Sequence, residues 1–302
     1  MSNTDLFLMS PPAVDWAIRG KANFRSAAAA AVDPRGARLE WISLADAIEQ
    51  RGGRVVCLVP PAGSGLTGLP YAAECGHVVD YRGELVFLLP NMAVEHRRSE
   101  RALWSELAVN LGLQPRSLPG IWEAQGDVAA FDGCTLLFYG GRTDATGLAG
   151  AQPYFEGETL TLRLREPAFH GNMAVLPLSA VDRLVVCPEV ICDDGYDRLR
   201  ARFGDDRILR VTEAEIRCYA TNGLPLGRQF LAPHLVPSRV RAMLEEQGME
   251  WVELEMRELC EKAGGASRCL VSHAHVDINR LTIDTSCDYR HLRGQLLAEV
   301  GA

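Results

Sequence analysis

The stretch Gly264-Gly265-Ala266-Ser267-Arg268-Cys269-Leu270, close to the C-terminus, is the most informative part of this 302-residue chain. Glycines let the backbone bend sharply and leave open space beside a neighbouring side chain. Cys269 is thus presented by a small-residue turn, where a thiol is either a packed small side chain or a nucleophile. An apolar run follows the turn, and the pattern predicts a strand over residues 269–272.

Two earlier clusters contain the other groups that a cysteine nucleophile needs. Pro167-Ala168-Phe169-His170-Gly171-Asn172 carries a histidine, and Trp122-Glu123-Ala124-Gln125-Gly126-Asp127 carries two acids. A cysteine, a histidine and an acid that lie far apart in sequence are the parts of a cysteine-nucleophile enzyme. Each residue also has a structural alternative: a buried cysteine, a capping or surface histidine, and an aspartate in a turn.

Composition and charge exclude several classes of protein. The chain is 47% hydrophobic and 23% charged, which is ordinary for a globular protein, and its net charge of -8 argues against nucleic-acid binding. Nine scattered cysteines without a CxxC pair indicate neither a disulfide scaffold nor a structural zinc site. The first residues do not resemble a signal peptide, and no apolar run is long enough to span a bilayer. We expect a reduced, cytoplasmic protein with no membrane partner. A homodimer is one assembly that the sequence allows.

Short apolar runs alternate with amphipathic stretches from end to end. Strands are predicted over residues 6–9, 55–59, 78–81, 85–89, 128–131, 135–139, 159–164, 173–178, 184–187, 208–211, 216–219, 251–254 and 269–272. Helices are predicted over residues 38–51, 98–111, 143–152, 193–203, 238–247 (capped by Ser238) and 289–299. The recurring order is strand, strand, helix, strand, and about five such units fit the chain. We expect one catalytic domain over residues 1–275 and an extension over residues 276–302 that serves as a lid or a tail.

The motifs, taken in order, resemble the pentein superfamily of guanidine-modifying enzymes: arginine deiminases, dimethylarginine hydrolases, arginine dihydrolases and amidinotransferases. The resemblance rests on LFLMSPP (6–12), AQGD (124–127), GGRT (140–143), EPAFHGNMAVLPL (166–178) and GGASRCLV (264–271). It implies an α/β fold of five ββαβ blades around a pseudo-fivefold axis. It also implies cleavage of a C–N bond in a guanidino or amidino substrate.

The resemblance assigns catalytic roles to three residues. Cys269 is expected to be the nucleophile that forms a covalent amidino-thioether, because a thiolate can attack the poorly electrophilic guanidinium carbon. His170 is expected to protonate the leaving amine and then to activate the second acceptor. Asp127 is expected to pair with the guanidinium nitrogens, which bond a carboxylate bidentately.

Further residues are expected to bind the substrate. Glu74 aligns with an acidic or amide position of the family and would complete the clamp around the cation, with Glu123 as a weaker candidate. Arg142 aligns with an arginine that holds the substrate carboxylate.

The chain also departs from the family pattern, mostly where relatives recognise the amino-acid end of the substrate. Asn172 replaces an acid near His170, Asn91 stands where several relatives have a carboxylate-binding arginine, and Ser10 replaces a cysteine. The segment 17–23 is also changed, and Arg19 or Lys21 there would be a new cationic partner. We therefore expect the reaction type to be retained and the substrate to be an amidino compound other than free L-arginine.

Several functions stay open at this level. Water as the second acceptor gives a hydrolase, which we favour, and an amine gives an amidinotransferase with the same residues. A non-catalytic pentein-fold binding protein and an enzyme acting on a substrate without a guanidine are further alternatives. No cofactor is expected, because the chain has no phosphate-loop or dinucleotide motif. No metal is expected either, because the pair His273 and His275 alone does not fill a coordination sphere.

Overall fold

The computed structural model describes residues 3–19, 23–29 and 31–301 as two compact units. The first unit comprises residues 1–90, 94–117 and 254–302, and the second comprises residues 91–93 and 118–253. The elements of the first unit are β1 (Thr4–Met9), α1 (Pro34–Glu49), β2 (Arg54–Cys57), β3 (His77–Tyr81), β4 (Glu84–Leu88), α2 (Glu100–Asn110), β5 (Gln114–Arg116), β15 (Ser272–Val276) and α7 (Tyr289–Ala298).

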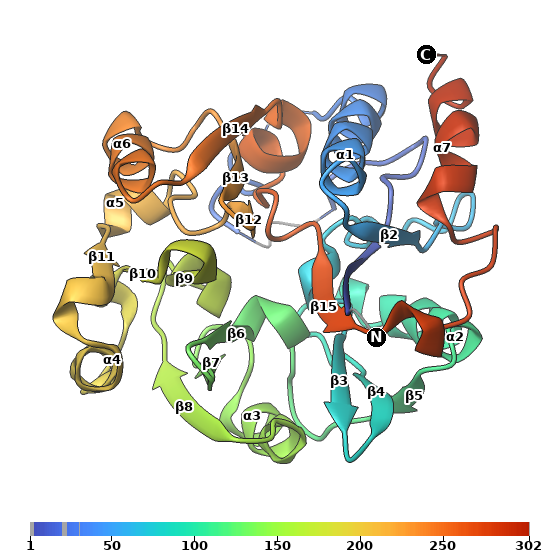
Figure 1. Cartoon of the computed structure of the whole chain (residues 1–302). Helices are drawn as coiled ribbons and strands as arrows, with labels where there is room; N and C mark the ends of the chain where they lie inside the picture. Colours follow the sequence, from blue (N-terminus) through green and yellow to red (C-terminus); the bar gives the residue numbers. More distant parts are fainter. Residues whose placement is uncertain (1–2, 20–22, 30, 302) are drawn as a thin grey trace. The chain divides into compact units, whose positions relative to one another are not determined.

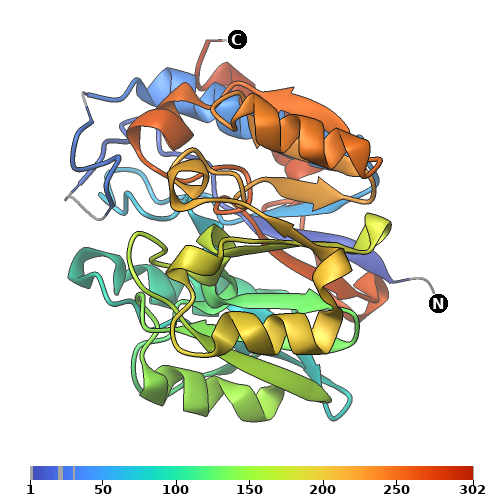
Figure 2. The same ribbon diagram turned by 90° about the vertical axis from the view of Figure 1, so that its left-hand side faces the viewer.

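The second unit contains nine strands and four α-helices within its described residues. They are β6 (Val128–Phe131), β7 (Cys134–Tyr139), α3 (Ala145–Ala151), β8 (Glu158–Arg163), β9 (Val175–Leu178), β10 (Arg183–Val186), α4 (Gly195–Phe203), β11 (Ile208–Arg210), α5 (Glu213–Ile216), β12 (Leu224–Leu226), β13 (Gln229–Pro233), α6 (Ser238–Glu246) and β14 (Glu250–Leu254). Figure 2 gives a view onto α4 (yellow) and α6 (orange), which face the viewer.

The strands form five three-stranded sheets with one recurring connectivity, as the sequence predicted. The sheets are β15-β1-β2, β3-β4-β5, β6-β7-β8, β9-β10-β11 and β12-β13-β14 (Figure 1). In each sheet the first two strands are antiparallel, and the third follows a helix and pairs with the middle strand. β7 and β8, for example, run parallel from Cys134 opposite Glu158 to Tyr139 opposite Arg163. A parallel neighbour requires such a crossover, and the intervening helix provides it.

One sheet is built from both ends of the chain. β1 pairs antiparallel with β15, so that Leu6 lies opposite Ala274, and it pairs parallel with β2 on its other edge. α7 then packs within the same unit, where the Tyr289 ring meets Trp41 of α1 edge-on at 5.8 Å. The Tyr289 hydroxyl also donates to Asp46 at 2.7 Å.

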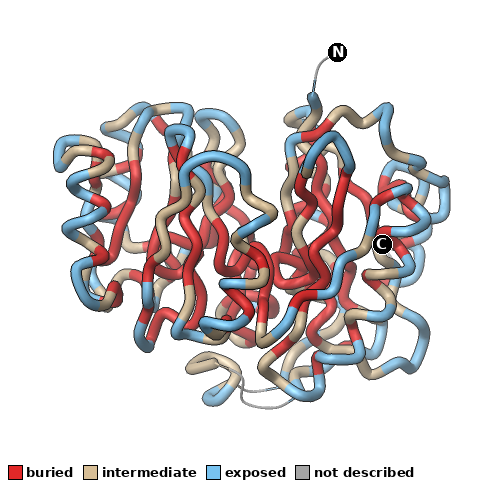
Figure 3. The backbone as a smooth tube through the Cα atoms, turned by 90° about the horizontal axis from the view of Figure 1, so that it is seen from below, coloured by how far each residue is buried: buried red, intermediate tan, exposed pale blue. Residues whose placement is uncertain are grey.

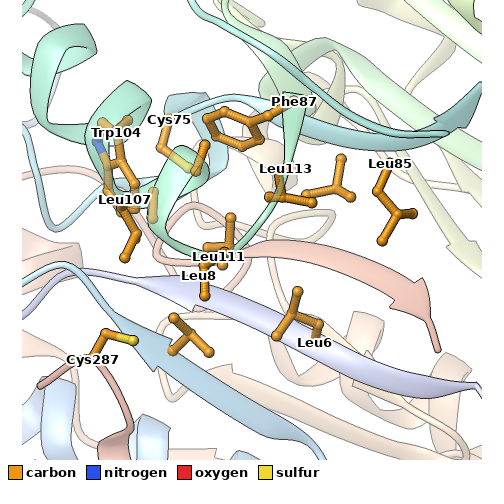
Figure 4. Close-up of a cluster of buried hydrophobic side chains, with 14 of the residues drawn as sticks. Leu6, Leu8, Cys75, Leu85, Phe87, Trp104, Leu107, Leu111, Leu113 and Cys287 are labelled. Atoms are coloured by element: carbon orange, nitrogen blue, oxygen red, sulfur yellow. The ribbon is translucent and has the colours of Figure 1, made fainter. Parts of the chain in front are cut away.

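The core of the first unit lies between its two sheets and α2 (Figure 4). It contains Leu6 and Leu8 of β1, Phe87 of β4 and Trp104 of α2, all almost completely buried. Alternate residues of a strand point to one face, so β1 contributes every second side chain to this cluster. In Figure 3 the buried backbone follows the strands, and exposed backbone lies mainly in the connections. None of the described helices is long and apolar enough to cross a membrane.

Three sequence predictions about local structure are wrong. Residues 216–219 form no strand, because a capping box between Thr212 and Glu215 starts α5 instead. Cys269 lies in a turn, and the strand begins only at Ser272. Ser238 is the first residue of α6 rather than its cap, since Pro237 occupies the cap position and no side chain caps the helix. The pattern also missed β5, β12, β13 and a π-helix over Arg257–Lys262.

Candidate active site

In the first unit, Cys269 lies in the turn that joins the π-helix Arg257–Lys262 to β15. Its backbone N–H donates to the carbonyl of Ala266 at 2.9 Å, and its own carbonyl accepts from the N–H of Ala73 at 3.0 Å. Only 3% of the residue is exposed. The backbone of Cys269 is thus held by hydrogen bonds through both its N–H and its carbonyl, which fixes the point from which the thiol projects.

Two glycines before the cysteine are needed for different reasons. Gly264 has φ +96°, a conformation that a residue with a side chain rarely adopts. A Cβ atom on Gly265 would lie 2.4 Å from the ring of Tyr71 and 3.1 Å from the Cβ of Cys269. The glycine-rich motif therefore allows the turn to pack directly against Tyr71.

We expect Gly265→Ala to displace the turn that carries Cys269. The added methyl group cannot fit against the half-buried Tyr71 ring without a shift of backbone or ring, and such overpacking costs about 1–3 kcal/mol. The alkylation rate of Cys269 by iodoacetamide, measured by peptide mass spectrometry, should change at least threefold. Gly294→Ala is the matched control, because a Cβ there meets no atom within 4 Å. An unchanged rate in Gly265→Ala would show that the turn tolerates the displacement.

Three other buried thiols of the chain, Cys260, Cys187 and Cys57, are poor nucleophiles at neutral pH. Burial raises the pKa of Cys260 well above its ordinary value, and the charge of Cys269 adds to the effect. Burial likewise raises the pKa of Cys187, to about 11, and that of Cys57. Because the thiolate is the reactive form, these cysteines stay inert.

Glu74, a predicted substrate carboxylate, already has a cationic partner within the protein. Arg97 Nη1 donates to Glu74 Oε2 at 2.5 Å, and Arg97 Nη2 lies 2.9 Å from Glu100 Oε2. All three side chains are almost completely buried. Burial lowers the pKa of Arg268 below its ordinary value. The nearby Cys269 and Glu74 partly oppose this lowering. The surroundings of the cysteine therefore contain a buried ion-pair network rather than an isolated acid.

In the second unit, His170 forms a short contact with Glu123. Their Nε2 and Oε2 atoms lie 2.7 Å apart, and each side chain is about 1% exposed. The other carboxylate oxygen of Glu123 accepts from the N–H of Ala93 at 2.8 Å. A carboxylate fixed in this way orients the imidazole ring and stabilises its protonated form. Chemically, such a pair can take up and release a proton.

Asp127 supports the backbone next to His170. Its carboxylate accepts from the hydroxyl of Thr143 at 2.7 Å and from the N–H of Gly171 at 2.8 Å. Burial raises the pKa of Asp127 to about 6, although His170, Thr143 and Gly171 each act to lower it. A Cβ atom on Gly126 would lie 3.0 Å from the His170 ring, so the preceding residue is also in close contact with the histidine.

The stability of the protein should depend on pH through Asp127. The native carboxyl keeps its proton up to about pH 6, whereas an unfolded aspartate loses it near pH 4. The free energy of unfolding of the wild type should therefore fall, relative to Asp127→Asn, by on the order of 2 kcal/mol as the pH rises from 4 to 6. Urea unfolding of both proteins at several pH values measures this difference. If the free energies of unfolding of the two proteins change with pH in parallel over that range, the pKa of Asp127 is not raised.

Arg142 completes the same network. Its Nη1 atom lies 3.6 Å from Glu123 Oε2, and its guanidinium carbon lies 4.8 Å from the centre of the Phe169 ring. The Phe169 ring in turn meets the His170 ring at 5.2 Å in an edge arrangement. Arg142 is only partly buried and carries a charge suited to an anionic group.

The remaining predicted binding residues, Asn172 and Asn91, also lie in the second unit. The carbonyl of Asn172 accepts from the side chain of Asn222 at 3.3 Å. The side-chain amide of Asn91 donates to the carbonyl of Gly120, and its backbone pairs with Trp122. The amide of Asn91 therefore holds a loop of the protein.

The structure brings together His170, Glu123, Asp127 and Arg142 in one unit, and Cys269 and Glu74 in the other. Sequence reasoning missed two residues that organise these groups, Thr143 and Arg97. Thr143 donates to Asp127 and accepts from the N–H of Glu123 at 3.0 Å. Its place in the motif Gly140-Gly141-Arg142-Thr143 was the available signal. Nothing in the sequence indicated that Arg97 pairs with Glu74.

His273 and His275 share one carboxylate on the neighbouring strand. Their nearest ring nitrogens lie 2.9 and 3.0 Å from Asp5 Oδ1. Within residues 3–19, 23–29 and 31–301, no group of three or more His, Cys, Asp or Glu side chains is arranged to hold a metal ion.

Comparison with known proteins gives matches at the level of structure. No family model matches the chain, and no curated protein matches its sequence. The N-terminal domain of ArgZ, a cyanobacterial arginine dihydrolase, superimposes with a TM-score of 0.79 at 21% identity, over 91% of this chain and 99% of that one. Dimethylarginine dimethylaminohydrolase superimposes with a TM-score of 0.67 at 17% identity, over 91% of this chain and 100% of that one. The chain has the pentein fold.

AgrE superimposes with a TM-score of 0.75 at 22% identity, and there the match covers 90% of this chain but 40% of AgrE. The pentein fold predicted from the five sequence motifs is thereby confirmed. At identities of 17–22%, the similarity establishes the fold of the chain and leaves its activity to be argued from its own residues.

Proposed function

We propose that this pentein cleaves a C–N bond in a guanidino or amidino substrate through a covalent intermediate on Cys269. The observation that carries the proposal is the buried contact between His170 and Glu123, with Asp127 fixing the adjacent backbone. Buried charged groups are costly and rarely arise without a task. These groups also occupy the positions that the sequence motifs assign to the acid–base residue and the cation-binding acid.

In the proposed reaction, the Cys269 thiolate attacks the central carbon of the amidinium group and forms a C–S bond. The C–N bond to the leaving amine breaks as His170 transfers a proton to that nitrogen. Water then loses a proton to His170 and attacks the same carbon, and the C–S bond breaks to restore the thiolate. Glu123 stabilises the imidazolium in both steps, and Asp127 pairs with the cationic substrate.

The relatives favour hydrolysis over transfer to an amine. One ArgZ structure contains a covalently bound reaction intermediate, and another contains substrate bound to a Cys-to-Ser variant. The dimethylarginine dimethylaminohydrolase structure likewise contains an adduct with S-methyl-L-thiocitrulline. Amidino transfer would use the same Cys269, His170 and Asp127, so it remains the second candidate. A non-catalytic binding protein is the third, and the buried acid–base network argues against it.

We further propose that the substrate is an amidino compound other than free L-arginine. Asn172 lacks the charge that relatives have beside the histidine, and Glu74 is paired with Arg97. Asn91 provides no cation for a substrate carboxylate, so Arg142 is the main candidate for that contact. Arg19 lies against Gly65 in the first unit, and Lys21 lies outside the described residues.

Mass spectrometry with a panel of guanidino compounds tests the proposal. The purified protein is incubated with arginine, methylated arginines, agmatine and other guanidino acids. Urea, ammonia, citrulline and transferred amidino products are measured, and intact-protein mass detects an adduct. An adduct on the Cys269 peptide together with released amine is the expected result. Absence of any turnover across the panel, with no adduct, would favour the binding-protein alternative. L-arginine as the best substrate would overturn the substrate proposal and leave the reaction proposal intact.

Three further expectations stay as proposals. All nine cysteines are free thiols, which suits a reducing cytoplasmic location. A homodimer is an assembly to test by light scattering. Residues 1–275 are proposed to act as one catalytic domain, with residues 276–302 as an extension.

A further inference from the structure

The π-helix Arg257–Lys262 precedes the cysteine turn and is held at its start by a buried acid from another helix. Glu40 of α1 is 8% exposed. Its two carboxylate oxygens accept from the N–H of Glu258 at 2.8 and 3.1 Å, and Oε2 also accepts from the N–H of Leu259 at 3.0 Å. The first N–H groups of a helix have no partner within the helix, so Glu40 satisfies groups that would otherwise be buried without one.

The same helix is connected to the cysteine turn by a continuous series of hydrogen bonds. The carbonyl of Leu259 accepts from the Tyr71 hydroxyl at 3.0 Å and from the N–H of Gly265 at 3.2 Å. The N–H of Gly264 donates to the carbonyl of Cys260 at 2.9 Å. Leu259 is therefore bound to Glu40 through its N–H and to the glycine turn through its carbonyl.

π-Helical turns are rare and frequently occur at functional sites. Here the extra residue per turn brings Leu259 and Cys260 opposite the glycines that lead to Cys269. A turn held in this way keeps its position only while the start of the helix is held. The contact with Glu40 lies far from the cysteine in sequence and is made by no residue of the catalytic motifs.

We propose that Glu40 is a positioning residue for the nucleophile: its carboxylate anchors the π-helix and thereby fixes the turn that presents Cys269. The inference rests on the proposed function only for its effect on turnover. Its effect on the structure of residues 257–269 can be measured without a substrate.

The charge of Glu40 makes the anchor sensitive to pH. Burial raises the pKa of Glu40 to about 7, with Glu258 adding to the rise and the backbone N–H groups opposing it. Charged groups around this contact include Glu255, Arg257 and Glu258, which line the same surface hollow as Glu40, and Asp33 and Lys262, which bond Glu258. Lys262 bonds both oxygens of Glu258, at 2.7 and 2.8 Å, so the lysine charge is directed at Glu258. Above about pH 7 the ionised Glu40 accepts more strongly, since hydrogen bonds to a charged acceptor are the stronger ones.

Hydrogen exchange of the full-length protein provides the first test. In Glu40→Ala, the peptide containing residues 257–269 is expected to exchange at least tenfold faster than in the wild type. Glu49→Ala is the matched control, because Glu49 ends the same helix and accepts from the N–H of Val55 at 2.8 Å, away from the π-helix. Glu40→Gln keeps an acceptor oxygen and should match the wild type below pH 6. The wild type should then become the slower-exchanging protein as the pH rises through about 7.

Chemical reactivity and turnover provide the second test. The buried Cys269 thiol should be alkylated at least fivefold faster in Glu40→Ala than in Glu49→Ala. With any substrate found, kcat should fall at least tenfold while KM changes less than threefold. If Glu40→Ala exchanges hydrogen and is alkylated at the same rates as the wild type, Glu40 is not an anchor, whatever the substrate is. Faster exchange and alkylation with unchanged kcat would show that Glu40 is an anchor and that Cys269 is not the nucleophile.

Discussion

Cys269→Ser is expected to abolish turnover while leaving the fold intact. One sulfur atom is replaced by oxygen in a turn whose backbone hydrogen bonds do not involve the side chain. A serine hydroxyl is a far weaker nucleophile than a thiolate at neutral pH, so we expect the rate to fall below detection, by about 10⁴-fold or more. Steady-state release of amine measures the rate, and thermal unfolding checks the fold.

Cys192→Ser is the control for this variant, because Cys192 is half-buried, belongs to the second unit and has no role in the proposed site. Its activity should equal that of the wild type. Substrate should also protect Cys269, and not Cys192, from iodoacetamide. Near-normal activity of Cys269→Ser would rule out a covalent mechanism at this residue.

His170→Ala should lower kcat by about a hundredfold or more, which is the usual contribution of an acid–base group. The leaving amine would have to depart without a proton, and water would have no base. Glu123→Gln should cause a smaller loss and shift the basic limb of the pH–rate profile to lower pH, because His170 must be protonated for the first step and the neutral amide no longer stabilises the imidazolium.

His234→Ala is the control for the histidine, since His234 is exposed on the same unit. Addition of imidazole should restore part of the activity of His170→Ala and have no effect on the wild type. If His170→Ala retains more than a tenth of the wild-type kcat, the histidine has a structural role only.

The sequence predicted much of the fold because the pattern repeats. Each unit of two strands, a helix and a third strand buries one face of a small sheet. The buried strands therefore appear in the sequence as short apolar runs. β12 and β13 escaped prediction because Pro225 and Pro233 lie within them and suggest breaks in regular structure. The π-helix escaped because its hydrogen-bond pattern has no recognisable sequence signal.

The candidate site was predicted as a set of residues but not as a set of contacts. Motif position led to the prediction of Cys269, His170 and Asp127 as catalytic residues, yet it did not indicate that Glu123 pairs with the histidine. The pairing of Glu74 with Arg97 depends on packing around a helix that starts at Glu100. Side-chain partners of this kind are determined by tertiary structure, and the pattern of a single sequence does not predict them.

The sheet β15-β1-β2 places a constraint on how the protein is made. β1 is synthesised first, but its antiparallel partner β15 emerges about 270 residues later, a very long loop to close. The cysteine turn directly precedes β15, so the docking of that last strand fixes the C-terminal side of the turn. A chain that lacks β15 would thus expose one edge of β1 and leave the cysteine turn without the strand that follows it. We therefore expect the cysteine turn to reach its final position only after strands from the two ends of the sequence have paired.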